Sequence, residues 1–585
     1  VLEWDQHGIK GTPWSLVRSL SKKTRYRVRL HNILSGIIEQ KVGLAQGPLL
    51  SPDRYNVLSS FLLTLLEDSG AGVTVLERTI LGASWSDDLN LLVEEGLLQR
   101  VLDVVAKFTS RLRLRVAHEK LFLIPLFVRA LHWAESGDTI TQKTTEVITT
   151  KVTIGGHPLT VKRSAKLLGR LFGQKIHQHS NYATLAKKST APAVGMLAWL
   201  GAFQPTASLE FAEFLYKSLV ESIITSKVST CQLSDADYKH LRATQCNICR
   251  RATWSGKRVS QYIILRELGW TPIDVAIKTA KVGLHNRLKL LKAREYASTV
   301  LEERMAAVAE GDKKGLCFEV KHLWTQLGRP EAWEAKNSNS DTGKKELKEA
   351  VKNLMQRRMD SWIRTNSDKN GDYAELCDHA HSSPAWHIGN GTKLQVGLMI
   401  TARAGACILR GNKTTDKRLS LADTLCLKCD RMAPETETHL LITCPYYNTW
   451  REPLLTKLHS VWSPQQRLAF RRADADQKRL FLLGARMDYG DDNMQLRRQR
   501  DLLVKDFLQS VNVHRTQEGL PDLRDAYNTQ TDFTIEEAIS WEEELRTELS
   551  QDGKSQEGNQ VPPSPSVSIH NRATHPTVHI HQHIL

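Results

Sequence analysis

Apolar residues recur at helical spacing in two segments near the start of the chain. In residues 51–70 the stripe consists of Leu58, Phe61, Leu62, Leu65 and Leu66. Ser51 can cap this segment, Pro52 suits the first helical position, and Gly70 is typical of a helix end. Residues 94–108 carry a second stripe of the same period. The pattern therefore predicts two amphipathic helices.

Strand-like runs lie between and after these helices. VTVLE (73–77) and TILGAS (79–84) lead into WSDD, a tight turn, and LNLLV (89–93) returns from it. Another apolar run, LFLIPLFV (121–128), follows the second helix. The predicted order is helix, strand, strand, helix, strand. One further strand in front, upstream of residue 1, would complete a split β-α-β-β-α-β arrangement.

Two adjacent carboxylates, Asp87 and Asp88, stand at the tip of the predicted hairpin. Like charges repel and are costly to desolvate, so this position has two interpretations. One is a solvent-exposed turn, in which Asp-Asp pairs are common. The other is a site for a divalent cation, which compensates the negative charges.

The composition favours a polyanionic partner, nucleic acid first. The chain has 585 residues, room for about three to five domains, and its net charge is +16 with a pI near 9.3. Basic residues cluster in residues 22–29, 111–116, 249–258 and 285–296. Each cluster is either a set of phosphate contacts or an ordinary solvated face.

Other classes are disfavoured by the same sequence. No run approaches the ~18 consecutive apolar residues of a membrane span. The first residues, VLEWDQHGIKG, lack the basic and apolar regions of a signal peptide, and a start at Val suggests a processed or incomplete chain. Nine cysteines do not make a disulfide framework and fit a reducing, intracellular compartment.

A family resemblance arises from the segments around the first predicted helix. GLAQGPLLSPDRYN (43–56) precedes it and the WSDD turn follows at a suitable distance. This pair resembles motifs B and C of the reverse transcriptases of non-LTR (LINE-type) retrotransposons, which usually have Tyr or Phe where Trp85 stands. The resemblance runs from residue 1 to about 455 and includes residues 7–28, 114–124, 166–172 and 262–291.

The resemblance implies binding roles for five residues. Gln46, Gly47 and Trp85 would contact the template or the incoming nucleotide. Glycine at 47 allows close backbone approach, and Gln46 can both donate and accept hydrogen bonds, although both also suit an ordinary loop. Leu168 and Gly169 would form the primer-grip turn.

The resemblance also implies catalytic roles for three residues. Asp87 would hold Mg²⁺ (or Mn²⁺), and Asp88 would have a secondary or structural part. Lys120 would contact phosphate or donate a proton, unless it is simply a surface lysine. A two-metal palm needs another aspartate on its first strand, and no matching motif is present, since Asp5 lacks the pattern.

The expected fold class is therefore α+β: an incomplete polymerase palm without its first strand, then mostly helical thumb and C-terminal regions and a small zinc knuckle. We expect the chain to be the C-terminal part of a longer polymerase or a degenerate remnant, and to polymerise poorly by itself.

A second candidate metal site has the spacing C-x2-C-x9-H-x4-C. Three thiolates and an imidazole complete a tetrahedral Zn²⁺ shell, and the alternative is three buried thiols with a surface histidine. The ligands would be Cys426, Cys429, His439 and Cys444. The segment resembles the C-terminal knuckle of LINE-type proteins. The neighbouring Tyr446, Tyr447 and Trp450 either stack on bases or pack the knuckle's own core.

A second C-x2-C pair, Cys246 and Cys249, has no matching downstream ligands, and the remaining cysteines fit buried thiols. The predicted organisation along the chain is a partial palm (1–175), a helical thumb-like region (176–300), a helical connection (301–400), the knuckle (401–455), a helical C-terminal region (456–548) and a disordered Gln/Ser/Pro-rich tail (549–585).

The leading functional hypothesis is a partial RNA-directed DNA polymerase, with an RNA template, a DNA primer or target and deoxynucleoside triphosphates as partners and no membrane. It would act in the nucleus after a cytoplasmic ribonucleoprotein stage. The alternative is a catalytically inactive nucleic-acid-binding remnant of such an element. A third possibility is an unrelated basic helical protein, which would bind neither Mg²⁺ nor Zn²⁺. The sequence does not indicate an oligomeric state.

Overall fold

The computed structural model divides the chain into two compact units, which are described separately. Unit 1 comprises residues 1–178, 292–303 and 563–585, and unit 2 comprises residues 179–291 and 304–562. The fold is mixed α and β with helices predominating, in agreement with the predicted α+β class. The structure describes residues 11–12, 15, 19, 25–27, 29–30, 33–39, 51–85, 88–126, 152–162, 164–167, 170–173, 180–292, 295–334, 341–366, 372–377, 384–385, 387–413, 420–485, 494–524 and 577–583.

The largest sheet in the described part of unit 1 has the strand order β12-β9-β15-β8-β7. Its strands are β7 (Gly82–Trp85), β8 (Asp88–Glu94), β9 (Phe122–Leu126), β12 (Thr160–Val161) and β15 (Thr577–His583). β12 pairs in parallel with β9, and the other neighbours are antiparallel. Because β8 and β9 are both antiparallel to β15, they are parallel to each other and are joined through a helix.

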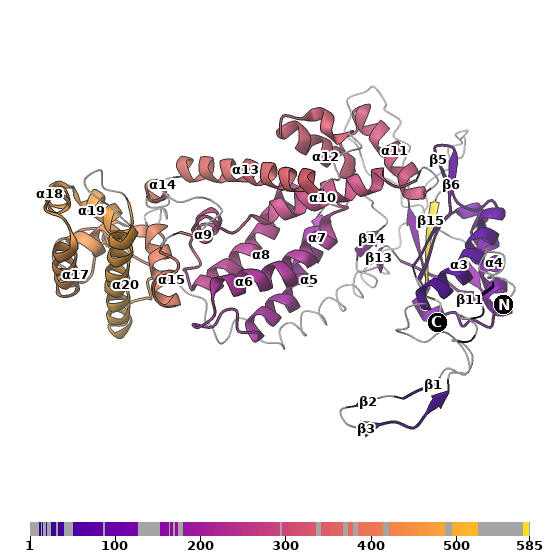
Figure 1. Ribbon diagram of the computed structural model, residues 1–585, viewed down its shortest axis with the longest axis horizontal. Helices are drawn as coiled ribbons and strands as arrows, with labels where there is room; N and C mark the ends of the chain where they lie inside the picture. The colour runs from indigo at the N-terminus through magenta and orange to yellow at the C-terminus, as the bar shows by residue number, and fades with distance from the viewer. Residues whose placement is uncertain are drawn as a thin grey trace, which may run out of the picture. The chain divides into compact units, whose positions relative to one another are not determined.

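Two amphipathic helices, α3 (Ser51–Asp68) and α4 (Leu98–Arg111), share one core with this sheet. The helices contribute Leu62, Leu66, Val101 and Val105, and the strands contribute Leu89, Leu91, Val93 and Leu123. The two helices predicted from apolar spacing thus form, within a few residues of the expected ends. In Figure 1 this sheet, marked by the yellow strand β15, lies beside α3 and α4.

The predicted strand TILGAS is interrupted at Leu81, because Gly82 has a backbone conformation that only glycine adopts readily. Its φ is +151°, and a Cβ there would lie 2.0 Å from the Asn90 carbonyl oxygen. β6 (Arg78–Ile80) therefore pairs with β5 (Val73–Val75) in a separate hairpin, while β7 pairs with β8. The glycine allows the chain to pass close to β8.

Residues 577–583 belong to the tail for which the sequence predicts disorder. They form β15, which is hydrogen-bonded to β8 on one side and to β9 on the other. The segment TVHIHQH alternates apolar and polar positions, as strands do. The residues before it are rich in Gln, Ser and Pro, and this composition is typical of disorder. The register pairs Ile580 with Leu91 and Leu123, both core residues. The tail residues 549–576 lie outside the described part.

Short ladders and turns complete the described part of unit 1. They comprise β1 (Arg25–Tyr26) with β4 (Ile38–Glu39), β2 (Arg29–Leu30) with β3 (Ile33–Leu34), β10 (Thr153–Ile154) with β11 (His157–Pro158), β13 (Ser164–Leu167) with β14 (Arg170–Gly173), and the turns η1 (Glu95–Leu97) and η2 (His118–Lys120).

Unit 2 is helical in its described residues. Its N-terminal helices are α5 (Ser180–Trp199), α6 (Leu209–Leu215), η3 (Tyr216–Glu221), α7 (Ser222–Val228), α8 (Asp235–Thr253), α9 (Gln261–Leu268) and α10 (Ile273–Lys289). Then follow α11 (Tyr296–Ala309, whose part up to Glu303 belongs to unit 1), α12 (Gly315–Gln326), η4 (Pro330–Trp333), α13 (Asp341–Thr365) and α14 (Tyr373–Leu376). The last are α15 (Lys393–Arg403), η6 (Gly411–Lys413), α16 (Leu421–Thr424), η7 (His439–Thr443), η8 (Pro445–Tyr447), α17 (Asn448–Val461), α18 (Pro464–Arg472), α19 (Ala475–Leu482) and α20 (Met494–Gln517).

One continuous hydrophobic core joins most of these helices, from Ala193 in α5 to Leu523 beyond α20, and α11, α12 and η4 contribute no residue to it. It includes Cys426 and Cys444, so the predicted knuckle is part of a larger body rather than a free-standing module. Capping boxes at Ser234, Thr392 and Ser463 satisfy the first backbone N–H groups of α8, α15 and α18. None of the described helices combines the length and apolar character that a membrane crossing needs.

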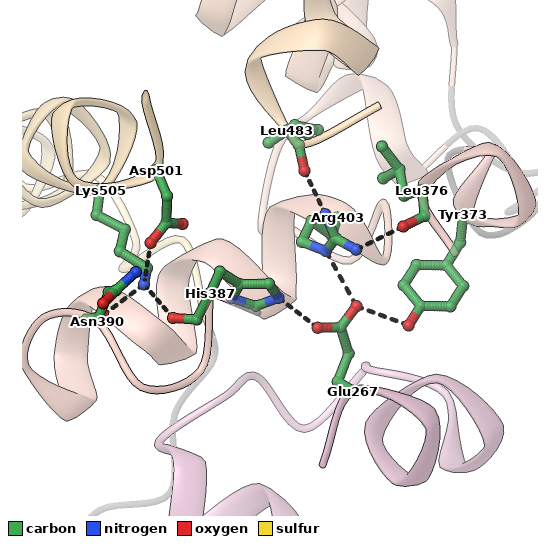
Figure 2. A network of polar contacts seen from close by, with 9 residues as sticks. All are labelled: Glu267, Tyr373, Leu376, His387, Asn390, Arg403, Leu483, Asp501 and Lys505. Atoms are coloured by element: carbon green, nitrogen blue, oxygen red, sulfur yellow. Dashed lines mark hydrogen bonds and ion pairs between the residues drawn. The ribbon is translucent and has the colours of Figure 1, made fainter. Parts of the chain in front are cut away.

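A fully buried polar network lies inside unit 2, centred on Glu267 of α9 (Figure 2). The Glu267 carboxylate accepts a hydrogen bond from the Tyr373 hydroxyl at 2.6 Å and from Arg403 Nε at 3.0 Å. It also accepts one from His387 Nε2. The Arg403 guanidinium donates further to the carbonyl oxygens of Leu376, at 2.9 Å, and Leu483. One carboxylate thereby connects elements distant in the sequence.

A second buried ion pair adjoins this network (Figure 2). The Lys505 ammonium of α20 lies 2.6 Å from Asp501 and donates to the His387 carbonyl oxygen at 2.6 Å. Burial lowers the pKa of His387 to about 4, although the Glu267 carboxylate acts against this shift. A neutral His387 leaves two acids and two bases in the network, so its charges balance.

Candidate metal centre

Four side chains with metal-ligand chemistry converge in residues 426–444 of unit 2. The ligand atoms of Cys426, Cys429, His439 and Cys444 all lie within 4.8 Å of one another. The turn that carries the first two cysteines closes through a bridge between Leu425 and Pro434 and a 2.9 Å bond from Cys426 N to Ala433 O. One helical turn, η7, carries His439 and leads to Cys444. The four residues predicted from spacing are therefore brought together.

The distances between these atoms fit a tetrahedral ion. With Zn–S bonds of ~2.3 Å and Zn–N bonds of ~2.0 Å, tetrahedral geometry places two sulfurs about 3.8 Å apart, and sulfur and nitrogen about 3.5 Å apart. The Cys426 and Cys444 sulfurs are 3.9 Å apart, and the Cys429 sulfur is 3.3 Å from His439 Nε2. The cluster is thus already close to the arrangement that a bound metal requires.

The imidazole of His439 is oriented by a neighbour on its own helical turn. His439 Nδ1 lies 3.0 Å from the Thr443 hydroxyl, and His439 Nε2 is directed at Cys429. A proton on Nδ1 that is donated to Thr443 leaves Nε2 free to coordinate. The histidine is buried, which removes the predicted alternative of a surface histidine beside three thiols.

The Cys426 and Cys444 thiols lie within hydrogen-bonding distance of each other. A hydrogen bond from Cys444 lowers the pKa of Cys426 to about 5, and the backbone N–H of Lys428 acts in the same direction. The same hydrogen bond raises the pKa of Cys444. The site therefore favours one thiolate even without a cation, and a bound cation favours ionisation of the others.

One buried ion pair and several hydrogen bonds hold the knuckle against the rest of unit 2. The Arg515 guanidinium of α20 pairs with Glu435 at 2.5 Å and donates to the Tyr447 hydroxyl at 2.9 Å. Arg451 of α17 donates to the carbonyl oxygen of Cys444 at 2.7 Å. Glu437 accepts hydrogen bonds from Asn412 and from the backbone of Cys407. These contacts fix the chain on both sides of the ligands.

The aromatic residues beside the cluster contact α20. Tyr447 is fully buried, and the Tyr446 hydroxyl lies 2.7 Å from His514 Nε2 in α20. The rings of Trp450 and His514 have centroids 4.4 Å apart. The sequence left open whether these residues stack on bases or pack the core of the knuckle. Tyr447 packs in the core, whereas Tyr446 and Trp450 are half-buried.

The second C-x2-C pair forms no cluster with other ligands among the described residues. Cys246 and Cys249 lie in α8 and are fully buried, and burial raises the pKa of both thiols, that of Cys246 to about 12. Cys231, Cys317 and Cys407 are buried as predicted, whereas Cys377 is half-buried.

Three of the residues suggested by the polymerase resemblance, Trp85, Asp88 and Lys120, lie in the main sheet of unit 1 or directly before one of its strands. Trp85 ends β7 and is paired in register with Asp88, the first residue of β8. Lys120 is exposed and ends the turn before β9. β13 and β14 form a hairpin whose register brings Leu167 opposite Arg170. Gln46, Gly47, Asp87, Leu168 and Gly169 lie outside the described residues.

Sequence reasoning missed the residues that support the metal ligands. Thr443 follows His439 by four residues in a helical turn, and that spacing was a usable signal. Glu435 and Arg515 are 80 residues apart, so no local sequence pattern indicates their contact.

No protein-family model matches the chain, and a search of curated proteins found no matching sequence.

Proposed function

We propose that the chain is part of an RNA-directed DNA polymerase of the non-LTR retrotransposon type. The observation that carries the proposal is the β7–β8 hairpin, with Trp85 opposite Asp88 at its end. The hairpin belongs to a sheet that shares its core with α3 and α4, in the predicted order helix, hairpin, helix, strand. If the β7–β8 hairpin lay far from a sheet covered by helices, the proposal would have no structural basis.

The position of β15 also supports it. In a split β-α-β-β-α-β sheet, the first strand lies between the third and fourth and is antiparallel to both. β15 has this position and direction between β8 and β9. Its residues 577–583, TVHIHQH, include no carboxylate. The strand that occupies this position therefore offers no second carboxylate for two-metal chemistry.

The proposed chemistry is nucleotidyl transfer in the intact parent. Mg²⁺ (or Mn²⁺) at the hairpin tip would stabilise the attacking and leaving oxygens. Asp87 would ligate it, and the neighbouring Asp88 would keep the tip negatively charged. Lys120, exposed before β9, would contact a phosphate. Gln46 and Gly47 would contact template or nucleotide.

The proposed partners are an RNA template, a DNA primer at a nicked target and deoxynucleoside triphosphates, and the net charge of +16 suits them. The alternative function is a catalytically inactive protein that still binds nucleic acid. The absence of a carboxylate from β15 favours this alternative for the chain acting alone.

One experiment separates these functions. The chain is mixed with a primed RNA template, and both fluorescence anisotropy and primer extension are measured with Mg²⁺, for wild type and for Asp87→Asn. We expect binding with little extension. Extension that depends on Asp87 would mean that the chain supplies its own second carboxylate and would establish the enzyme. Binding without extension supports the inactive alternative, and absence of binding refutes both.

We further propose that the Cys₃His cluster binds Zn²⁺ as a structural ion. The four protein ligands leave no open coordination position, which is typical of structural rather than catalytic zinc. We expect one zinc per chain by elemental analysis, loss of the zinc in Cys429→Ser, and retention in Cys231→Ser, which alters a buried thiol elsewhere. Full zinc content in Cys429→Ser contradicts the proposal. Cobalt substitution gives thiolate-dependent absorption as an independent measurement.

A further inference from the structure

A cavity of about 190 Å³ lies in unit 2 among α8, α10, α12 and α13. These helices are neighbours in Figure 1, and the cavity is far larger than one water molecule needs. Its lining is unusually rich in charge and includes Arg242, Asp274, Lys278, Lys281, Glu319 and Arg358. None of the residues assigned above to the polymerase or the metal centre lines it.

Two of the acids in this lining are already neutralised. Arg242 holds Asp274 in a forked contact, with Nε at 2.9 and 3.1 Å from the two carboxylate oxygens. Lys281 pairs with Glu319 and donates to the Cys231 carbonyl oxygen at 2.6 Å. Asp274 and Lys281 are almost completely buried. These pairs form a fixed wall with no net charge.

Two cations remain, Lys278 and Arg358. In the described part of the chain, no hydrogen bond or ion pair joins either one to a carboxylate; the Lys278 ammonium lies 5.5 Å from the ring centre of Tyr238. Burial lowers the pKa of Lys278; the Asp274 carboxylate acts against this shift, and the positive charge of Arg358 adds to it. Both cations line the same cavity, and Asp274 is already paired with Arg242.

The other lining groups do not supply the missing anion. Asp235 is exposed in the first turn of α8, where water and the helix N-terminus stabilise its charge. Burial raises the pKa of Tyr238 well above its ordinary value, so the phenol stays neutral. An anion that enters from solvent and binds between Lys278 and Arg358 would relieve their repulsion.

We propose that this cavity binds a phosphate group between the Lys278 ammonium and the Arg358 guanidinium. The guanidinium fork matches two phosphate oxygens, and the ammonium acts as a point charge on a third. The phosphate belongs either to a free nucleotide or to the backbone of a single-stranded nucleic acid. Both sources offer the same chemistry, and the test below distinguishes them.

Isothermal titration calorimetry of the full chain tests the proposal. The probes are adenosine 5′-monophosphate, adenosine as the phosphate-free control, and a short single-stranded RNA without terminal phosphates. Lys278→Gln and Arg358→Gln each remove one cation. Lys239→Gln is the matched control, since Lys239 is exposed on α8 and does not line the cavity.

We expect a phosphate-bearing probe to bind, adenosine not to bind, and each cavity variant to weaken binding about tenfold while the control changes it less than twofold. An effect on the monophosphate assigns the cavity to a free nucleotide, and an effect on the RNA alone assigns it to backbone phosphate. Unchanged binding in both variants, or no binding of either probe, overturns the proposal. Arg358 is exposed, so Arg358→Gln decides the matter if Lys278→Gln fails to fold.

Discussion

Replacing Glu267 with glutamine removes one negative charge from the centre of the buried network without changing the size of the side chain. Arg403 then keeps its charge in a fully buried position, with two carbonyl oxygens but no counter-ion. The amide of the new glutamine can satisfy only some of the three donors that now face the carboxylate. We expect Glu267→Gln to be strongly destabilising.

The magnitude follows from the geometry. Breaking a buried ion pair by removing one partner costs about 3–5 kcal/mol, because the other charge is left without compensation. Glu267 and Arg403 are both fully buried, so water does not reduce this cost. With a urea m-value of ~3 kcal/mol per molar, the unfolding midpoint of unit 2 falls by about 1–1.7 M.

Urea unfolding followed by circular dichroism at 222 nm measures this shift, since most described helices lie in unit 2. Glu349→Gln is the control: it makes the same chemical change at an exposed pair on α13, where we expect less than about 0.5 kcal/mol. The double variant Glu267→Gln/Arg403→Met should recover part of the loss. A cost below about 1 kcal/mol for Glu267→Gln would refute the role assigned to the network.

Three other predictions concern pH, a hairpin and the metal. Burial lowers the pKa of His387 from 6.5 to about 4, so below pH 6.5 the unfolded chain binds a proton that the folded chain does not, and stability falls as the pH drops towards 4. Between pH 7 and pH 5 the wild type should lose about 2 kcal/mol more than His387→Gln in urea unfolding, and equal losses contradict the assignment. Gly82→Ala should cost at least ~2 kcal/mol in the thermal unfolding of unit 1, whereas Gly96→Ala, where a Cβ meets nothing within 4 Å, should be neutral. Thr443→Val should weaken zinc binding about 10–100-fold in a chelator competition; unchanged affinity would mean that Thr443 does not orient His439.

Features governed by local spacing were predictable from the sequence. The helices that became α3 and α4 follow from a 3.6-residue period, and the β7–β8 hairpin follows from strand-like runs on either side of a turn. The Cys₃His set was predictable because its four ligands lie within 19 consecutive residues, 426–444. Each of these signals depends on residues close together in the chain.

Features that depend on distant partners were not predictable. Glu267 contacts Tyr373, which is 106 residues away in the sequence, and Arg403, which is 136 residues away. The spacing of apolar residues along the chain does not indicate such contacts. β15 pairs with β8 from the opposite end of the chain, and its composition suggested disorder. The sequence did not predict that the strand run 79–84 breaks before Gly82, because the backbone φ of a glycine cannot be inferred from a strand-like pattern.

The attachment of the knuckle to α20 limits how far the protein can be dissected. A fragment covering residues 401–455 would keep all four ligands and lose Arg515 and His514, the side chains that anchor Glu435 and Tyr446. The excised loop would have to order itself when it captures an ion, at the expense of affinity. Zinc titrations on so short a peptide would therefore understate the affinity of the whole chain.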